Sequence, residues 1–327
     1  MKPAFATCLR FLALTLLCQL AASGAWAQRA NAAQLDYRLA ARELARGVWV
    51  VEGDNADFTV ANGCNIINTA FVATGAGVLV INTGPSRRYG EQLRELIRRT
   101  TSEPVLQVLH LNLHPDYFLG NQAFADVPRL ATATTRAGIG REAAAYESNL
   151  YRLCGEWMRG TATLAPDQDF ATPTPSGRLR IGQRDFEWHA LRGHTASDLV
   201  LVDSTSGVAF VGGLVFSDRV PTTPHARIDE WLASLGTLQA LGLRTVVPSH
   251  GPVHAAGQGV DQTRRYLGWL DSSFTSWAES GLDMNDVLRA PVPEEFRRWA
   301  AFGTEYVRNV AHLYPVYEQR ALGGTKR

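Results

Sequence analysis

Metal-binding side chains are concentrated in one short segment that follows an apolar stretch. Residues 104–110 are largely apolar, and polar side chains then stand at Asn112, His114, Asp116 and Tyr117. Strands fix positions in an α/β protein, while the loops at their ends carry the functional groups. Histidine and aspartate are common zinc ligands. The segment therefore predicts a metal-binding loop in which some ligands have been replaced.

Two further histidines lie far downstream, each beside an apolar run. His194 stands in a Gly-His-Thr segment and His250 in a Ser-His-Gly segment. An α/β scaffold can build a metal centre by bringing histidines together from separate strand-end loops. A zinc ion held in this way lowers the pKa of a bound water, which then acts as a nucleophile. The spacing therefore indicates a metallohydrolase.

The elements that must position these residues begin with a buried strand. Residues 78–81 are an apolar run that ends at a polar, glycine-containing turn. Residues 89–100 then place leucine and isoleucine at helical spacing, and residues 104–110 form the next buried strand. This strand–loop–helix–strand order predicts a layered α/β domain.

The same reading extends along the rest of the chain. No low-complexity linker divides it, so we expect one domain over residues 28–327 with a helical C-terminal end at about residues 257–320. The other expected strands are 47–52, 66–74, 178–189, 198–203, 208–211 and 245–247, and the other expected helices are 136–159, 228–241, 260–280 and 294–313.

The order of the motifs resembles that of the metallo-β-lactamase superfamily. The resemblance covers residues 47–254 and implies an αββα sandwich, with two mixed β-sheets inside and helices on both faces. Each motif alone is weak, but their order and spacing are specific. The five segments that carry it are Ile81-Asn82-Thr83-Gly84, Asn112 to Tyr117, Gly193-His194-Thr195, Gly212 to Phe216, and Pro248-Ser249-His250-Gly251.

A narrower resemblance rests on two longer runs. The segment from Leu113 to Gln122 and the run from Val215 to Pro221 look like those of the quinoprotein relay system zinc metallohydrolases. That resemblance implies a periplasmic protein associated with dehydrogenases that use pyrroloquinoline quinone (PQQ). The partners it implies are a small-molecule substrate and a periplasmic quinoprotein dehydrogenase or cytochrome c.

The superfamily's ligand pattern carries over to this sequence only in part. The superfamily binds two metals through a His-x-His-x-Asp-His loop, two later histidines and a bridging aspartate. The matching residues here are His114, Asp116, His194 and His250. Asn112, Tyr117 and Gly213 stand where the superfamily has a histidine, a histidine and the bridging aspartate, and Asn82 replaces a supporting aspartate. The resemblance therefore implies one zinc ion, with a second left open.

The expected activity is hydrolysis of an ester, lactone or amide by metal-activated water. Asp116 would hold the metal or its water, while Tyr117 and Asn112 would polarise or orient the substrate. Asp116 has a second interpretation as a cap of the helix that follows the loop. The alternative function is a non-catalytic periplasmic accessory protein that keeps the fold and a degenerate metal site.

The N-terminus has the pattern of a signal peptide. Lys2 and Arg10 precede or flank an apolar run that is too short to span a bilayer, and Ala25-Trp26-Ala27 offers a cleavage site. Removing residues 1–27 leaves 30 basic and 31 acidic residues, a net charge of −1. Nucleic acid is therefore not expected as a partner, and neither is a membrane span in the exported protein.

The remaining cysteines and histidines leave some alternatives open. Cys64 and Cys154 either form a disulfide in an oxidising compartment or remain buried thiols. His110 is expected in the core, His225 to line the pocket and His254 at the surface.

Overall fold

The computed structural model describes residues 35–255 and 257–324. The chain divides into two units, Met1–Arg38 and Leu39–Arg327. The predicted signal segment, residues 1–27, lies outside the described residues, and everything below concerns the second unit. No helix within the described ranges is long and apolar enough to cross a membrane.

The first sheet has seven strands that neighbour one another in chain order. β1 to β4 pair antiparallel, whereas β4 to β7 pair parallel, so the sheet is mixed. All four residues of β4 are buried, as expected for a strand covered on both faces. The strands are β1 Arg42–Ala45, β2 Val48–Val51, β3 Thr69–Ala73, β4 Val78–Ile81, β5 Val105–Leu109, β6 Arg129–Ala131 and β7 Gln168–Asp169.

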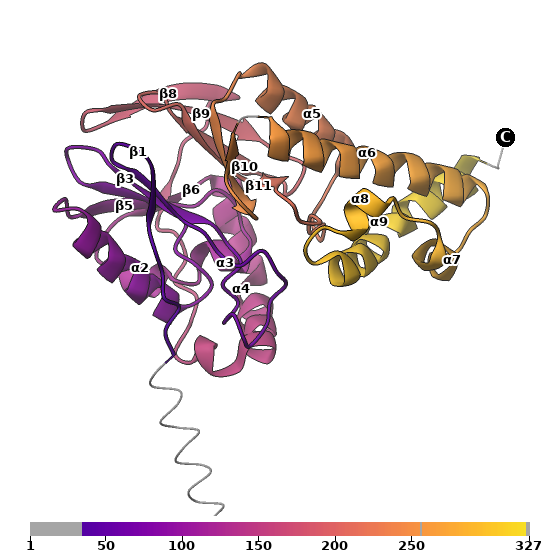
Figure 1. Cartoon of the computed structure of the whole chain (residues 1–327), viewed down its shortest axis with the longest axis horizontal. Coiled ribbons are helices and arrows are strands. Elements are labelled where there is room, and N and C mark those ends of the chain that lie inside the picture. Colours follow the sequence, from indigo (N-terminus) through magenta and orange to yellow (C-terminus); the bar gives the residue numbers. More distant parts are fainter. Residues whose placement is uncertain (1–34, 256, 325–327) are drawn as a thin grey trace, which may run out of the picture. The chain divides into compact units, whose positions relative to one another are not determined.

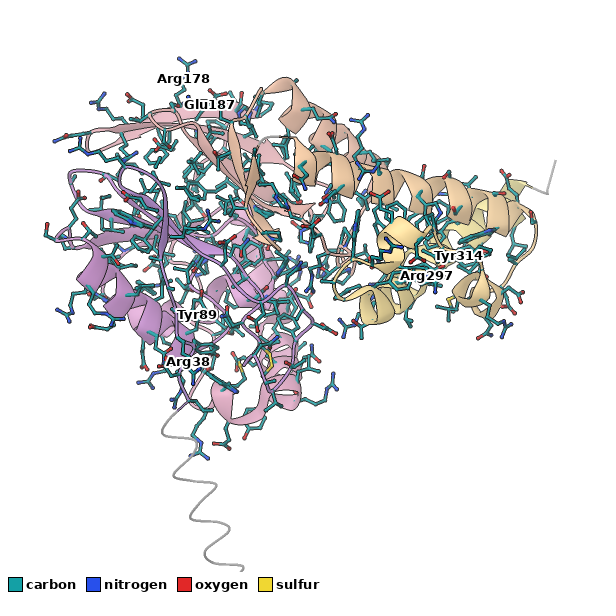
Figure 2. All side chains as sticks on the ribbon, in the orientation of Figure 1. Arg38, Tyr89, Arg178, Glu187, Arg297 and Tyr314 are labelled. Atoms are coloured by element: carbon teal, nitrogen blue, oxygen red, sulfur yellow. A yellow bond between two sulfur atoms is a disulfide. The ribbon has the colours of Figure 1, made fainter. Side chains whose placement is uncertain are left out.

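The second sheet has six strands in the order β13-β12-β11-β10-β9-β8. β11 and β12 pair parallel and the other neighbours antiparallel. Exposure alternates along β8, and Arg178, opposite Glu187 in register, projects away from the sandwich (Figure 2). The strands are β8 Ser176–Ile181, β9 Arg184–Leu191, β10 Asp198–Asp203, β11 Val208–Phe216, β12 Thr245–His250 and β13 His254–Ala255.

The two sheets pack face to face, with helices on the outer face of each (Figure 1). A core between the sheets joins Leu79 and Leu109 of the first to Leu201 and Phe210 of the second. α2 (Arg87–Thr100) and α4 (Ala133–Cys154) lie beside the first sheet, and α5 (Ile228–Ala240) and α6 (Gln258–Glu279) cover the second. This arrangement confirms the predicted αββα sandwich of two mixed sheets.

Two sequence predictions of secondary structure were wrong in detail. Residues 178–189 form two strands, because Gly182, with φ +58°, turns the chain between β8 and β9. The predicted helix at 294–313 is split into α8 (Glu294–Arg297) and α9 (Phe302–Gly324), and α7 (Met284–Arg289) was not predicted. The remaining short elements are α3 Pro115–Phe118 and the 3-10 turns η1 Asn121–Phe124 and η2 Gly155–Met158.

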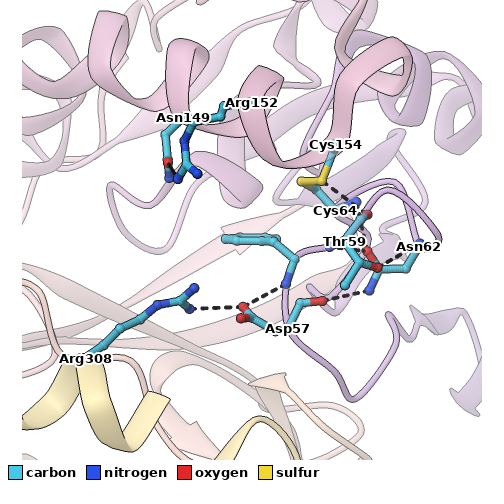
Figure 3. The surroundings of a disulfide bond; sticks show 9 residues. Asp57, Thr59, Asn62, Cys64, Asn149, Arg152, Cys154 and Arg308 are labelled. Carbon is cyan, nitrogen blue, oxygen red and sulfur yellow. Dashed lines mark hydrogen bonds and ion pairs between the residues drawn. A yellow bond between two sulfur atoms is a disulfide. The ribbon is translucent and has the colours of Figure 1, made fainter. Parts of the chain in front are cut away.

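A disulfide joins the segment before β3 to the end of α4. Cys64 and Cys154 are both fully buried, and their Cα atoms lie 5.9 Å apart (Figure 3). This finding settles the choice that the sequence left open. The bond encloses a sequence separation of 90 residues, so it strongly restricts the unfolded chain.

Replacing both cysteines, Cys64→Ala/Cys154→Ala, is expected to lower the free energy of unfolding by about 2–4 kcal/mol. Urea unfolding of the oxidised wild type and the double variant measures the difference. The reduced wild type is the matched control, because it loses the same cross-link without a change in side-chain volume. Equal stability of all three proteins would contradict the prediction.

Candidate metal site

A cavity of about 430 Å³ opens where the metal-binding loop was predicted. His114, Asp116 and His250 line it, as does His225, which the sequence also placed at a pocket. The remaining lining residues come from the segment before β3, from α3, from α4, from the loop before α5 and from α9. They are Phe58, Ile66, Pro115, Glu142, Tyr146, Asn149, Arg152, Leu153, Thr222, Pro224, Glu305, Arg308 and His312.

The loop that carries His114 is held by two asparagine side chains. The side-chain oxygen of Asn82 accepts a hydrogen bond from the backbone N–H of Leu111 at 3.2 Å. The Oδ1 atom of Asn112 accepts one from the backbone N–H of His114 at 3.0 Å. Helix α3 then begins at Pro115, whose fixed φ suits the first helical position. Both asparagines, Asn82 and Asn112, therefore shape the loop. The resemblance places them where the superfamily has an aspartate and a histidine.

Asp116 and His250 form a buried pair. The Oδ2 atom of Asp116 lies 3.5 Å from Nε2 of His250, and both side chains are about 3% exposed. His250 donates from Nδ1 to the carbonyl of Ile66 at 2.7 Å, which leaves the lone pair on Nε2 facing the carboxylate. Burial raises the pKa of Asp116 to about 7, and burial together with the nearby charge of Arg219 lowers the pKa of His250 well below 6.5.

The turn after His250 requires a glycine. Gly251 has φ +84°, and a Cβ atom there would lie 1.8 Å from the carbonyl oxygen of Ser217. Ser217 in turn donates its backbone N–H to the carbonyl of His250 at 3.0 Å. The Ser-His-Gly motif therefore fixes His250 at the end of β12.

His194 is fully buried behind His114, with their ring centroids 4.6 Å apart. Its Nδ1 atom lies 3.3 Å from Oδ1 of Asp198, a carboxylate that also accepts hydrogen bonds from the backbone and hydroxyl of Thr195. A carboxylate at Nδ1 holds the proton there and leaves Nε2 as a lone-pair donor. Nε2 of His194 has no hydrogen-bond partner among the residues that the structure describes.

Gly213 on β11 makes room for the His194 ring. A Cβ atom at 213 would lie 1.9 Å from Nδ1 of His194 and 2.9 Å from Nδ2 of Asn112. An aspartate at this position cannot coexist with His194 as it is placed. The residues of this chain therefore do not fit a carboxylate-bridged pair of metals.

His225 contacts His114 within the cavity lining. Nε2 of His114 and Nδ1 of His225 are 3.2 Å apart, and the ring centroids are 5.4 Å apart. Burial, followed by the charges of neighbouring histidines, lowers the pKa of His114 well below 6.5 and also lowers that of His225. Both rings are therefore neutral at neutral pH, the form that binds a metal.

The other two residues with predicted roles are buried beside this cluster. Tyr117 is fully buried, burial raises the pKa of its hydroxyl well above 10, and that hydroxyl has no hydrogen-bond partner among the described residues. The amide of Asn112 lies 3.4 Å from Nδ1 of His194 and is likewise fully buried. Neither side chain lines the cavity. Asp116 lies in the first turn of α3, where a negative charge is favoured.

The donor set fits a single metal ion better than two. Within residues 35–255 and 257–324, no three His, Cys, Asp or Glu side chains are already arranged around a common point. However, Oδ2 of Asp116 and Nε2 of His194 are buried and have no hydrogen-bond partner in the described chain. A buried polar atom without a partner costs about 1–3 kcal/mol, so a cation that used these lone pairs would be stabilised. One ion held by imidazoles and Asp116 therefore fits the residues present, after side-chain rotation.

The cavity also contains residues that the sequence did not indicate. Arg308 and His312 come from α9, and Glu142 comes from α4. Arg308 donates to Asp57 at 3.1 Å, across from Arg152 and Asn149 on α4 (Figure 3).

His254, expected at the surface, is only 22% exposed and lies 3.1 Å from Asp218, whereas His110 is fully buried as predicted.

Comparisons with known proteins agree with this architecture. The family model of the metallo-beta-lactamase superfamily matches residues 62–250, more than half of the chain. Among curated proteins, none matches the sequence.

Solved structures share the fold at low sequence identity. A metallo-beta-lactamase from Pontibacter korlensis is 22% identical with a TM-score of 0.56, covering 71% of this chain and 99% of that one. TMB-1 is 19% identical with a TM-score of 0.56, covering 71% and 98%. A metallo-beta-lactamase from Hirschia baltica is 16% identical with a TM-score of 0.54, covering 70% and 97%. Because the family model matches residues 62–250, more than half of the chain, this chain belongs to the metallo-beta-lactamase superfamily.

Proposed function

We propose that this protein is an exported, zinc-dependent hydrolase with one metal ion. The ion would be held by residues from His114, Asp116, His194 and His250. When bound, zinc supplies a Lewis acid and a water of lowered pKa. The substrate is an ester, lactone or amide small enough for the cavity of about 430 Å³.

The observation that carries this proposal is a pair of buried lone-pair atoms at the family's site that make no hydrogen bond with any residue that the structure describes, one of which, Oδ2 of Asp116, has a 3.5 Å contact with Nε2 of His250. Within the described residues, Oδ2 of Asp116 and Nε2 of His194 have no hydrogen-bond partner. Nδ1 of His250 donates to the carbonyl oxygen of Ile66, and Nδ1 of His194 faces a carboxylate oxygen of Asp198. Both histidines can therefore present Nε2 to a metal. Such outer contacts are typical of histidines that bind zinc.

The chain's own residues supply the rest of the site. Asp116 would orient the attacking water or hold the metal. Tyr117 and Asn112 lie behind the ligands, where Asn112 fixes His114 and contacts His194. We therefore assign these two residues to positioning the site, since neither reaches the cavity.

We also propose the narrower assignment to the quinoprotein relay system zinc metallohydrolases. It rests on the motifs from Leu113 to Gln122 and from Val215 to Pro221, and on the signal-like N-terminus. The disulfide between Cys64 and Cys154 agrees with export, because such bonds persist in oxidising compartments. A periplasmic PQQ-dependent dehydrogenase or its cytochrome c is the partner that this assignment proposes.

A second candidate is the non-catalytic accessory protein. It is favoured by the lack, within the described ranges, of any three ligand side chains around a common point. Gly213 also favours the accessory protein, because the His194 ring occupies the space that a side chain at 213 would need.

The test is the metal content of residues 28–327, purified without a metal-binding tag or chelator. We expect about one zinc per chain in the wild type and its loss in His114→Ala/His194→Ala, because two imidazole ligands are removed. His254→Ala is the matched control, since its imidazole pairs with Asp218 and does not line the cavity. Elemental analysis is followed by a hydrolysis screen of esters and lactones with and without chelator.

The outcomes separate the two candidates. One zinc and a chelator-sensitive hydrolysis support the hydrolase. Folded wild type that binds no zinc, or binds it equally in the double variant, contradicts the hydrolase and supports the accessory protein.

A further inference from the structure

We propose that His225 is a metal ligand of this site and replaces the histidine that the superfamily has at the position of Asn112. The inference rests on the proposed zinc binding and names a ligand that the superfamily pattern does not include. It places the ion among His114, His194 and His225, three imidazoles of the kind that hold catalytic zinc.

The first step is the geometry between His225 and His114. Two nitrogens that bind the same zinc tetrahedrally, at about 2.0–2.1 Å each, lie about 3.3 Å apart. Nδ1 of His225 and Nε2 of His114 are 3.2 Å apart. The ring of His194, whose Nε2 is unpartnered among the described residues, lies 4.6 Å from that of His114, so a third imidazole is within reach.

The second step is the fate of Asn112. Its Oδ1 accepts the backbone N–H of His114, and its amide faces His194. The side chain is fully buried and does not line the cavity. Asn112 therefore supports the backbone of His114 from behind and leaves one ligand position on the cavity side to another residue.

The third step is that His225 is held in place by the fold. Its loop precedes α5, and Arg227 donates its backbone N–H to the carbonyl of Gly193 at 2.7 Å, next to His194. On the other side, Thr223 donates its hydroxyl to Asn309 of α9 at 2.7 Å, and Asn309 donates to the carbonyl of Pro221 at 3.1 Å. Both Thr223 and Asn309 are about 1% exposed or less.

The same contact has a simpler interpretation, in which His225 only hydrogen-bonds His114. The two interpretations predict different effects of an asparagine at position 225. A side-chain amide keeps a hydrogen bond to His114 but is a poor zinc ligand. His225→Asn therefore separates a ligand from a hydrogen-bond partner.

The experiment measures zinc affinity by competition with a chromophoric chelator for the wild type, His225→Asn and His312→Asn. We expect affinity to fall at least about tenfold in His225→Asn, because losing a ligand weakens binding no less than losing an outer contact. His312→Asn is the matched control: His312 also lines the cavity and contacts Thr223, but its ring has no contact with His114 within the described residues. Its affinity is expected to match the wild type.

A second readout is the position of the ion itself. Crystals grown with zinc and measured at the zinc edge are expected to show an anomalous peak within bonding distance of His225. Wild type that binds zinc, with His225→Asn unchanged and no peak at His225, overturns this inference and leaves the proposed hydrolase standing. Wild type that binds no zinc overturns both.

Discussion

Arg219→Met is expected to lower the free energy of unfolding by about 3–5 kcal/mol at pH 8 and by much less at pH 5. Arg219 is fully buried and lies 3.6 Å from Glu305 of α9, which is itself about 1% exposed. It also donates to the carbonyl of Ala56. Removing the arginine leaves a buried carboxylate with a weaker set of partners.

The groups that face Glu305 come from three parts of the second unit. Arg219 follows β11, Arg308 lies on α9 and donates to Glu305 at 2.9 Å, and Asp57 lies after β2 and accepts from Arg308. Burial raises the pKa of Glu305 to about 7 despite both arginines, and Asp57 adds to the rise. The cluster ties the C-terminal helix to the segment that leads into the disulfide (Figure 3).

The pH dependence follows from proton binding. Glu305 titrates near 4.5 when unfolded and near 7 when folded, so the folded protein holds an extra proton between these values. Stability is therefore greatest below pH 4.5 for this group and decreases as the pH rises through 7. Without Arg219, the pKa of Glu305 in the folded protein rises further. The free energy of unfolding of the variant therefore continues to decrease above pH 7.

Urea unfolding at pH 5 and pH 8, with chelator present so that metal binding does not contribute, measures both differences. Arg298→Met is the control, because Arg298 and its partner Glu294 are 76% and 61% exposed, so solvent screens the pair. We expect it to cost about 0–1 kcal/mol. An equal loss in Arg219→Met at both pH values would show that packing, and not charge, determines the effect.

The sandwich was predictable because its strands carry strong local signals. Val78–Ile81 is uniformly apolar and ends at a turn, and the structure confirms it as the buried strand β4. The hairpin at Gly182 was missed because apolar residues continue on both sides of the turn, as in one long strand. α8 and α9 are separated by a segment that ends at Ala301, which has a φ of 58°. The side-chain pattern does not predict that conformation.

The sequence named four candidate metal ligands but not their contacts, and one of them, His194, lies buried beside His114 and does not line the cavity. The motif order indicated that His114, Asp116 and His250 belong together, and the structure brings all three to one cavity. The contributions of Arg308 and His312 could not be predicted, because they depend on how α9 packs 50 or more residues after the last motif. The sequence also showed that Gly213 supplies no metal ligand. It did not show that the His194 ring occupies the space of a side chain at 213.

Gly213→Asp, which restores the residue type of the superfamily pattern, is expected to destabilise the protein by about 3–5 kcal/mol and to abolish zinc binding. The new Cβ would lie 1.9 Å from Nδ1 of His194. That ring packs against Trp231, Phe216 and His114, with ring centroids at 5.0, 5.6 and 4.6 Å, so it cannot move aside without disturbing the core. Overpacking a core and burying a carboxylate both lower stability.

A double-mutant cycle with His194→Ala tests this cause. If the overlap with the ring produces the loss, Gly213→Asp should cost much less in the His194→Ala background, so the two effects will not be additive. Gly213→Ala, which adds only the Cβ, separates the overlap from the charge, and urea unfolding in chelator gives the free energy of unfolding of each of the five proteins. A Gly213→Asp protein as stable as the wild type that binds two zinc ions would mean that His194 can rotate away. The replacements at Asn112 and Tyr117 would then be compatible with a two-metal centre, and the single-metal assignment would be wrong.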